Sequence, residues 1–178
     1  MKQDGAFWMS IDDFVYCYKS LYVCRIFEPT SWRSIRKQGK WEGDSAAGLP
    51  SAKNPGAMIN KNPHYGIRVF KKCTLFIELQ QNEIEGSWKG KNFIYYMVQR
   101  NAGKRVKNIS IDKLCGKSDS ATNTSTISGQ IELEASTFPY VFSLVVACIN
   151  AGDTGSFNVT IYCNDMDVEV IDDSEFDV

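Results

Sequence analysis

From Tyr65 onward, the sequence repeatedly places apolar residues at every second position, with polar residues between them. Residues two apart lie on the same face of a strand, so each such stretch has one buried and one solvated face. Half-polar strands that follow one another without helices between them are typical of an antiparallel β-sandwich. We therefore predict a mainly β, eight-stranded antiparallel sandwich, with strands near 65–69, 75–80, 92–99, 106–111, 130–135, 140–149, 157–163 and 168–170.

The segment before this region contains a helical pattern. Ser10 is a favourable N-cap residue, and Asp13 stands three positions later, as in an acidic capping box. Apolar residues between Ile11 and Tyr22 then recur at helical spacing, which places them on one stripe. Such a stripe has to be buried, so we expect this helix either to dimerise or to contact a flanking segment. The run Leu21–Phe27 is rich in β-forming residues and predicts a strand after the helix.

Residues 28–63 are interrupted by repeated Pro and Gly, which break regular structure. The segment nevertheless contains Trp32 and Trp41, and burying two such large side chains would order it. We predict a long irregular segment that is pinned by these tryptophans, rather than a disordered linker.

Charge is distributed unevenly along the 178 residues. All 20 Lys and Arg lie in residues 1–117 with 10 acidic residues, whereas residues 118–178 hold 11 acidic residues and no base. Such polarity indicates either pairing between the two parts or two surfaces for different partners. The basic residues are scattered, so nucleic acid is not expected as a partner. No apolar stretch approaches the roughly 18–20 residues of a membrane helix, and the start has no secretory signal pattern.

Six cysteines allow two alternatives. Three disulfides, together with glycosylation sequons at Asn108, Asn123 and Asn158, would fit a secreted glycoprotein. We favour reduced thiols, because several cysteines lie in apolar segments where a free Cys behaves as a small core residue. Zinc is not expected because there is no C-x-x-C pair. The cysteines are Cys17, Cys24, Cys73, Cys115, Cys148 and Cys163.

The sequence does not indicate an active site. His64 is the only histidine, and its place beside Pro63 favours a position at the start of a strand over a Cys–His catalytic pair. There is no G-x-S-x-G nucleophile turn and no glycine-rich phosphate loop before a helix.

Two charged groups are candidate binding sites. Hard oxygen ligands on sandwich-edge loops can hold Ca²⁺, and we single out Asp165, Asp167, Asp172 and Asp173; a charged, frayed C-terminus is the alternative. Basic residues around an exposed tryptophan could contact anionic lipid or another protein, although a turn with a packed Trp is the simpler interpretation. These residues are Lys71, Lys72, Trp88, Lys89 and Lys91.

Four motifs in residues 4–65 form an ordered series. They are Asp4-Gly5-Ala6-Phe7-Trp8-Met9-Ser10 with Asp13-Phe14, then Leu21-Tyr22-Val23-Cys24-Arg25, then Trp41-x-Gly43-x-Ser45-Ala46-x-Gly48, and finally Asn62-Pro63-x-Tyr65. This series resembles the calpain family, and most closely the membrane-anchored plant-type calpains. The first two motifs resemble the end of the calpain protease core, and the last two resemble the start of its C2-like β-sandwich domain.

The resemblance implies three parts: residues 1–25 as the tail of the protease core, 26–171 as the C2-like sandwich, and 172–178 as an acidic tail. It implies a regulatory and docking domain of a calcium-dependent cysteine endopeptidase in intracellular limited proteolysis, with the protease core in the same chain as partner. The Cys, His and Asn of the calpain triad are absent. The implied location is cytoplasmic, with membrane association through the parent protein as an alternative.

The sequence departs from the animal calpains where they insert a long acidic loop, since Lys71-Lys72-Cys73 is short and basic. Calcium is the one cofactor to consider, through the C-terminal acidic residues. The alternative function is a free-standing C2-like module that binds lipid or calcium.

Overall fold

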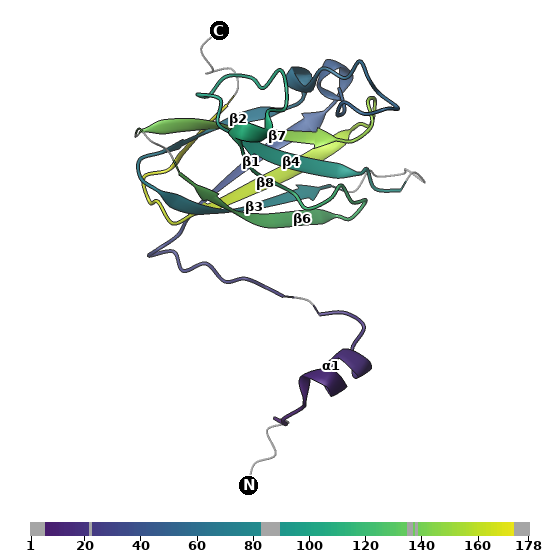
Figure 1. The fold of residues 1–178 in the computed structure, drawn as a ribbon, viewed down its shortest axis with the longest axis vertical. Coiled ribbons are helices and arrows are strands. Elements are labelled where there is room, and N and C mark those ends of the chain that lie inside the picture. The colour runs from purple at the N-terminus through teal and green to yellow at the C-terminus, as the bar shows by residue number, and fades with distance from the viewer. Residues whose placement is uncertain (1–5, 22, 83–89, 135–136, 138, 173–178) are drawn as a thin grey trace.

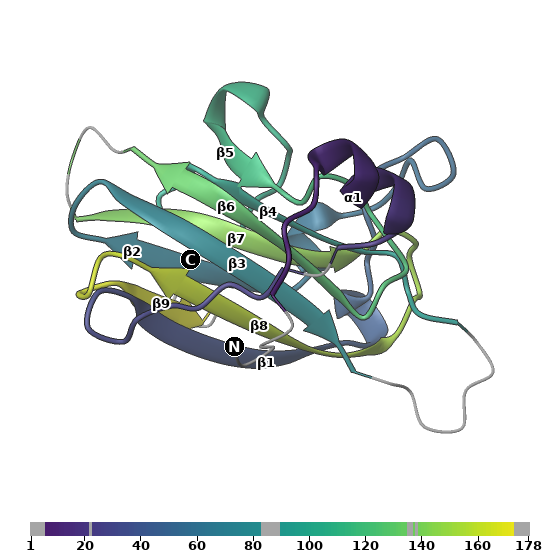
Figure 2. The same ribbon diagram turned by 90° about the horizontal axis from the view of Figure 1, so that it is seen from below.

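The computed structural model describes residues 6–21, 23–82, 90–134, 137 and 139–172. In these residues, two antiparallel sheets pack face to face as a β-sandwich, which confirms the predicted fold class (Figure 1, Figure 2). The first sheet has the strand order β1 (Arg33–Trp41), β8 (Gly155–Cys163), β3 (Cys73–Gln81) and β6 (Thr126–Leu133). The second has the order β5 (Leu114–Lys117), β4 (Ile94–Gln99), β7 (Tyr140–Cys148), β2 (His64–Val69) and β9 (Glu169–Asp172).

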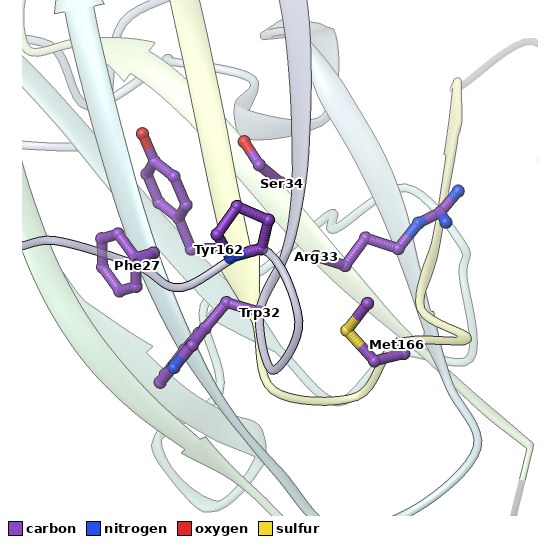
Figure 3. Close-up of a pocket in the computed structure, with 7 residues that line it drawn as sticks. Phe27, Trp32, Arg33, Ser34, Tyr162 and Met166 are labelled. Carbon is purple, nitrogen blue, oxygen red and sulfur yellow. The ribbon is translucent and has the colours of Figure 1, made fainter.

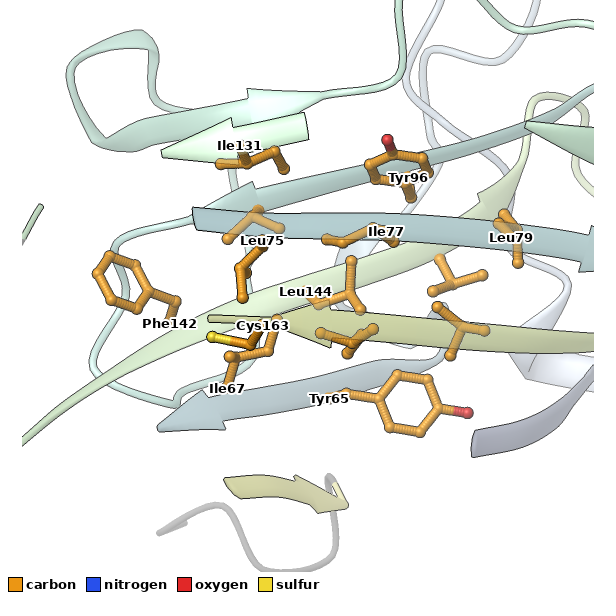
Figure 4. Packing of buried hydrophobic residues seen from close by; sticks show 14 of the residues in the cluster. Tyr65, Ile67, Leu75, Ile77, Leu79, Tyr96, Ile131, Phe142, Leu144 and Cys163 are labelled. Atoms are coloured by element: carbon orange, nitrogen blue, oxygen red, sulfur yellow. The ribbon is translucent and has the colours of Figure 1, made fainter. Parts of the chain in front are cut away.

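The core lies between the sheets because alternate residues of each strand point inward (Figure 4). Along β3, Leu75, Ile77 and Leu79 are fully buried, as their alternation predicts. Strand β7 is buried on both faces. Its Phe142 and Leu144 face the central core, whereas Val145 and Ala147 pack in a second cluster with Leu49, Ile59, Met97 and Val106.

The irregular segment that covers this second cluster is shorter than predicted. Strand β1 occupies Arg33–Trp41, within the range expected to lack regular structure. Trp41 is buried, packs against Phe157 with ring centroids 4.5 Å apart, and donates from Nε1 to the Val146 carbonyl oxygen. Trp32 is only partly buried. The prediction of pinning tryptophans is therefore met in full only at Trp41, and the prediction of irregular structure is wrong for 33–41.

Other boundaries also differ from prediction. Helix α1 covers only Ile11–Cys17, and the described residues between Leu21 and Phe27 form no strand. No strand occupies 106–111, where Ile109 and Ile111 are exposed. Short 3₁₀ helices lie at Gly43–Ser45, Ile59–Lys61 and Ile111–Lys113. No described helix is both long and apolar enough to cross a membrane.

Ion pairs show how the charge polarity of the sequence is accommodated. Of five ion pairs among the described residues, four join a base from the first 117 residues to an acid from the remainder. They are Lys37–Asp172, Arg68–Glu169, Lys71–Asp165 and Lys72–Glu134. Among the described residues, pairing between the two parts of the chain thus offsets part of the charge asymmetry.

Candidate functional site

The most unusual surface is the arm, which we define as residues 6–32. It projects from the sandwich and carries α1 at a distance from both sheets (Figure 1). No residue of α1 is buried. Ser10 caps the helix, since its hydroxyl accepts a hydrogen bond from the Asp13 N–H at 3.1 Å. A run of large apolar side chains is exposed along the arm: Phe7, Trp8, Ile11, Val15, Tyr16, Leu21, Val23 and Ile26.

Such a concentration of exposed apolar residues marks an interaction surface in a stable protein. Trp8 is 100% exposed and Tyr16 is 90% exposed, so the sandwich does not bury these side chains. The predicted helical stripe is present only over Ile11–Cys17, because α1 ends there, and no described residue of the sandwich buries it.

The arm is held to the sandwich at one place. The Phe27 ring stacks on Tyr162 of β8, with centroids 4.0 Å apart, and contacts Trp32 and Phe76 at 5.0 Å and 5.3 Å. Figure 3 shows Phe27, Trp32 and Tyr162 around a cavity of about 440 Å³. Arg25 completes the attachment. Its Nη1 donates to Gln130 Oε1 at 2.9 Å, and its guanidinium lies 4.8 Å from the centroid of the Phe76 ring.

Sequence reasoning missed this attachment. Phe76 and Tyr162 lie on the outer face of their sheet, where the alternation predicts solvated residues. Phe76 and Tyr162 are two aromatic residues directly opposite each other on an otherwise polar face. Such a pair predicts that another segment packs over it, because large rings on a solvated face are stabilised by burial.

The acidic candidates for calcium are separated by the fold. Asp165 is fully buried in the turn between β8 and β9, where its Oδ2 accepts from the Phe70 N–H at 2.9 Å. Its Oδ1 accepts from the Asp167 N–H at 3.3 Å and lies 3.8 Å from Lys71 Nζ. Asp172 is at the other end of β9, where it pairs with Lys37 at 3.1 Å.

Asp167 is exposed, and Asp173 lies outside the described residues. No group of three or more His, Cys, Asp or Glu in the described part of the chain is placed to hold a metal ion. Asp165 is thus engaged by two backbone N–H groups and a lysine, and Asp172 is engaged by a lysine. Calcium binding by the full acidic set stays a prediction.

The basic candidates are likewise dispersed. Lys71 lies near Asp165, and Lys72 pairs with Glu134, which raises the pKa of Lys72 and lowers that of Glu134. Lys91 donates to the Ser125 hydroxyl. Trp88 and Lys89 lie outside the described residues, so their contact with lipid or a protease core stays a prediction.

His64 has a structural position. It is buried, its Nδ1–H donates to the Asn62 carbonyl oxygen at 2.6 Å, and its Nε2 accepts from the Val106 N–H at 3.1 Å. The ring therefore joins the loop before β2 to the loop after β4. His64 is the first residue of β2, as predicted, and this arrangement commits both ring nitrogens to the backbone.

All six cysteines are free thiols in the structure, and Cys24 is exposed rather than part of the core. The neighbouring Cys163 thiol, together with burial, raises the pKa of the Cys73 thiol far above its usual range. Burial also raises the pKa of Cys148 to about 12. These buried thiols are therefore protonated and poor nucleophiles at neutral pH. The sequon residue Asn158 is buried and bonded to Asn82, so it is closed to glycosylation in the folded chain.

Comparison with known proteins gives relatives of one kind. No model of a known protein family matches the chain. Calpain-type cysteine protease ADL1 of Oryza sativa subsp. japonica is 28% identical over 90% of this chain, and Calpain-type cysteine protease DEK1 of Zea mays is 27% identical over 90%. The Calpain-2 catalytic subunit of Mus musculus is 26% identical over 60%. The chain spans 8% of the length of these plant relatives and 15% of the mouse protein.

Among solved structures, a chain of the Israeli acute paralysis virus particle aligns at a TM-score of 0.32 with 10% identity, over 81% of this chain and 75% of that one. That likeness is too weak to support an argument about function. The curated relatives agree with the four motifs that resemble the calpain family in residues 4–65. Along nine-tenths of its length, the chain is similar to calpain-type cysteine proteases of plants.

Proposed function

We propose that this chain is a non-catalytic regulatory and docking module of a calpain-type cysteine endopeptidase. In this proposal, the arm completes a protease core that belongs to the same protein, and the sandwich is the body that holds the arm in place. The observation that carries the proposal is the run of exposed apolar side chains on the arm, in a chain whose relatives are calpain-type proteases.

The division of contacts along the arm supports this role. Arg25 and Phe27 bind the arm to the first sheet, whereas none of the α1 residues is buried. An arm with this pattern is fixed to one body and is able to bury its remaining apolar residues against a second. Both ring nitrogens of His64, the only histidine in the sequence, are bonded to backbone groups, which supports a module that does not itself cleave peptides.

The first test is the sequence that precedes Met1 in the full-length protein. The proposal requires a papain-like lobe with a catalytic Cys, and an upstream region without one contradicts it. The 178-residue chain itself should cleave no casein, with or without calcium.

The second test uses the full-length protease and places one charge on the arm. Val15→Asp should lower peptidase activity more than about tenfold, because an unpaired buried charge costs several kcal/mol at an interface. Met58→Asp is the matched control, since Met58 is also exposed but lies on the sandwich. Equal activity of both variants and the parent protein would contradict docking of the arm on the protease core.

The free-standing calcium- or lipid-binding module remains the alternative class. The described positions of Asp165 and Asp172 do not favour calcium, because a lysine lies beside each carboxylate. Calorimetric titration with calcium separates the two: heat at submillimolar calcium, abolished by Asp167→Asn, would favour the module.

A further inference from the structure

We propose that the cavity at the base of the arm is a binding site for a small aromatic carboxylate. The cavity, of about 440 Å³, lies where the arm meets β1 and the turn between β8 and β9. Its volume falls within the roughly 300–1,000 Å³ of small-molecule sites, which suits one compact ligand. Two of its lining residues are polar, and the others are aromatic or apolar: Phe27, Pro29, Trp32, Tyr162 and Met166. The site does not depend on the docking role of α1.

The apolar part of the lining favours a flat, apolar ligand body. Figure 3 shows Phe27, Trp32 and Tyr162 on one side of the cavity and Met166 with Arg33 on the other. Met166 is 39% exposed, so its thioether keeps surface that a ligand can cover. Aromatic rings pack favourably against other rings, and methionine sulfur makes favourable contacts with ring edges. An aromatic ring is therefore the group that this lining stabilises best.

One positive charge at the cavity has no counterion among the described residues. Arg33 lines the cavity, and it makes no ion pair with a described carboxylate. Glu28 and Asp167 are near in sequence, but neither is among the lining residues. A guanidinium binds a carboxylate through two parallel N–H···O bonds, and the hydroxyl of Ser34, the second polar lining residue, is a further donor. A ring that carries one carboxylate thus matches both the apolar and the charged part of the lining.

Backbone contacts hold the two sides of the cavity in place. On the arm, the Trp32 N–H donates to the Glu28 carbonyl oxygen at 2.9 Å, which closes the turn that precedes β1. On the sandwich, the Val168 N–H donates to the carbonyl oxygen of the buried Asp165 at 3.2 Å, which closes the turn that contains Met166. Ligand binding therefore orders side chains rather than backbone, which keeps its entropic cost low.

A ligand in this cavity contacts both the arm and the sandwich. Phe27 and Trp32 belong to the arm, whereas Tyr162 and Met166 belong to the sandwich. Detaching the arm separates these two sets of residues, so the ligand binds the attached arm only and stabilises the attachment by mass action. The site therefore gives a small molecule control over how firmly the arm is held.

The test is a fluorine NMR titration of the 178-residue chain with para-trifluoromethylphenylacetate at about 150 mM salt, where long-range attraction is largely screened. For a probe of this size we expect saturable binding with a dissociation constant on the order of 1 mM. Arg33→Gln should weaken binding more than about tenfold, because it removes the charged donor. Arg36→Gln is the matched control, since it removes the same charge from an exposed position of β1 outside the cavity, and it should bind like the parent chain.

The neutral amide of the same probe checks the role of the charge. The amide should bind the parent chain more than about tenfold more weakly than the carboxylate, and this difference should disappear in Arg33→Gln. Three results would overturn the site: no saturable binding of the carboxylate up to about 10 mM, equal losses in Arg33→Gln and Arg36→Gln, or equal binding of carboxylate and amide by the parent chain.

Limited proteolysis tests the link between the site and the arm. At ten times its dissociation constant, the probe should slow tryptic cleavage after Arg25 about tenfold, because the fraction of chains with a detached arm falls by that factor. Cleavage after Lys19 is the internal control, because this residue is exposed on the arm beyond the attachment, and its rate should not change. Unchanged cleavage after Arg25, or equal slowing at both residues, would contradict a ligand that bridges the arm and the sandwich.

Discussion

Replacing Asp165 tests whether the acidic C-terminal region is a structural element or a calcium site. The carboxylate is fully buried and accepts from two backbone N–H groups, those of Phe70 at 2.9 Å and Asp167 at 3.3 Å. Through Phe70 it joins the turn after β2 to the turn after β8. Asp165→Ala should therefore destabilise the sandwich whether or not calcium is present.

The magnitude follows from these contacts. A hydrogen bond to a charged group contributes about 1.5–3 kcal/mol, and loss of the acceptor leaves the Phe70 N–H unpaired. With the weaker Asp167 contact added, Asp165→Ala should lower the free energy of unfolding by about 2–4 kcal/mol. Asp165→Asn keeps one carbonyl acceptor and should lose about half as much.

Lys71 provides the control. Its Nζ lies 3.8 Å from the Asp165 carboxylate, and its side chain is 60% exposed. Solvent reaches the lysine side of this long contact, so the pair contributes about 0–1 kcal/mol and Lys71→Gln should cost far less than Asp165→Ala. The ranking of the three variants thus separates backbone capping from charge pairing.

The assay is urea unfolding followed by the fluorescence of the buried Trp41, with and without millimolar calcium. A loss below about 0.5 kcal/mol for Asp165→Ala would refute the capping role, since this is the range of ordinary surface substitutions. Calcium that stabilises the parent chain but not Asp165→Ala would refute the structural interpretation and assign Asp165 as a ligand.

Three further predictions concern other parts of the chain. Burial raises the pKa of Cys148 to about 12, so the native state keeps a proton that the unfolded chain loses near pH 8.5–9, and the free energy of unfolding falls as pH rises from there toward 12. Urea unfolding between about pH 9 and 11 should therefore show a smaller loss of stability with pH in Cys148→Ala than in the parent chain. An equal loss in both proteins would contradict this. Phe27→Ala removes three ring contacts, each contributing about 0.5–1.5 kcal/mol. Tryptic cleavage after Arg25 should therefore become roughly tenfold faster, while the urea midpoint of the sandwich stays the same. Unchanged cleavage would show that the arm is held elsewhere. His64→Leu leaves the Val106 N–H and the Asn62 carbonyl without the ring and should cost about 2–4 kcal/mol in the same unfolding assay, whereas a loss under about 1 kcal/mol would contradict the bridging role.

The sequence predicted the central strands well because their pattern is strong. Burial alternates along β3 and along β8 from Val159 to Cys163, and β7 is an apolar run that two clusters bury from both sides. Strand β1 was missed because its inward positions include Lys37 and Gly39, which carry no apolar signal. It is an edge strand, bonded to β8 alone, and edge strands tolerate such residues.

The missed and mistaken parts of the candidate sites depend on tertiary contacts. The apolar character of Val106, Ile109 and Ile111 predicted a strand, but only Val106 is buried, and the His64 ring holds its N–H in place of a neighbouring strand. Lys104, Arg105 and Lys107 were recognisable as a basic group. They line one pocket with Lys113 because of how the loop closes, which the local sequence pattern does not encode.

The arm joins the sandwich directly before β1, and β1 and β9 belong to different sheets. The Lys37–Asp172 contact nevertheless ties these two edge strands together across the open side of the sandwich. A force on α1 large enough to detach Phe27 would therefore act on β1 before the other strands. The Lys37–Asp172 ion pair would then transmit part of that force to β9. Movements of the arm are in this way coupled to the edge strand β9 at the surface, beside the route that runs through β8 and the apolar core.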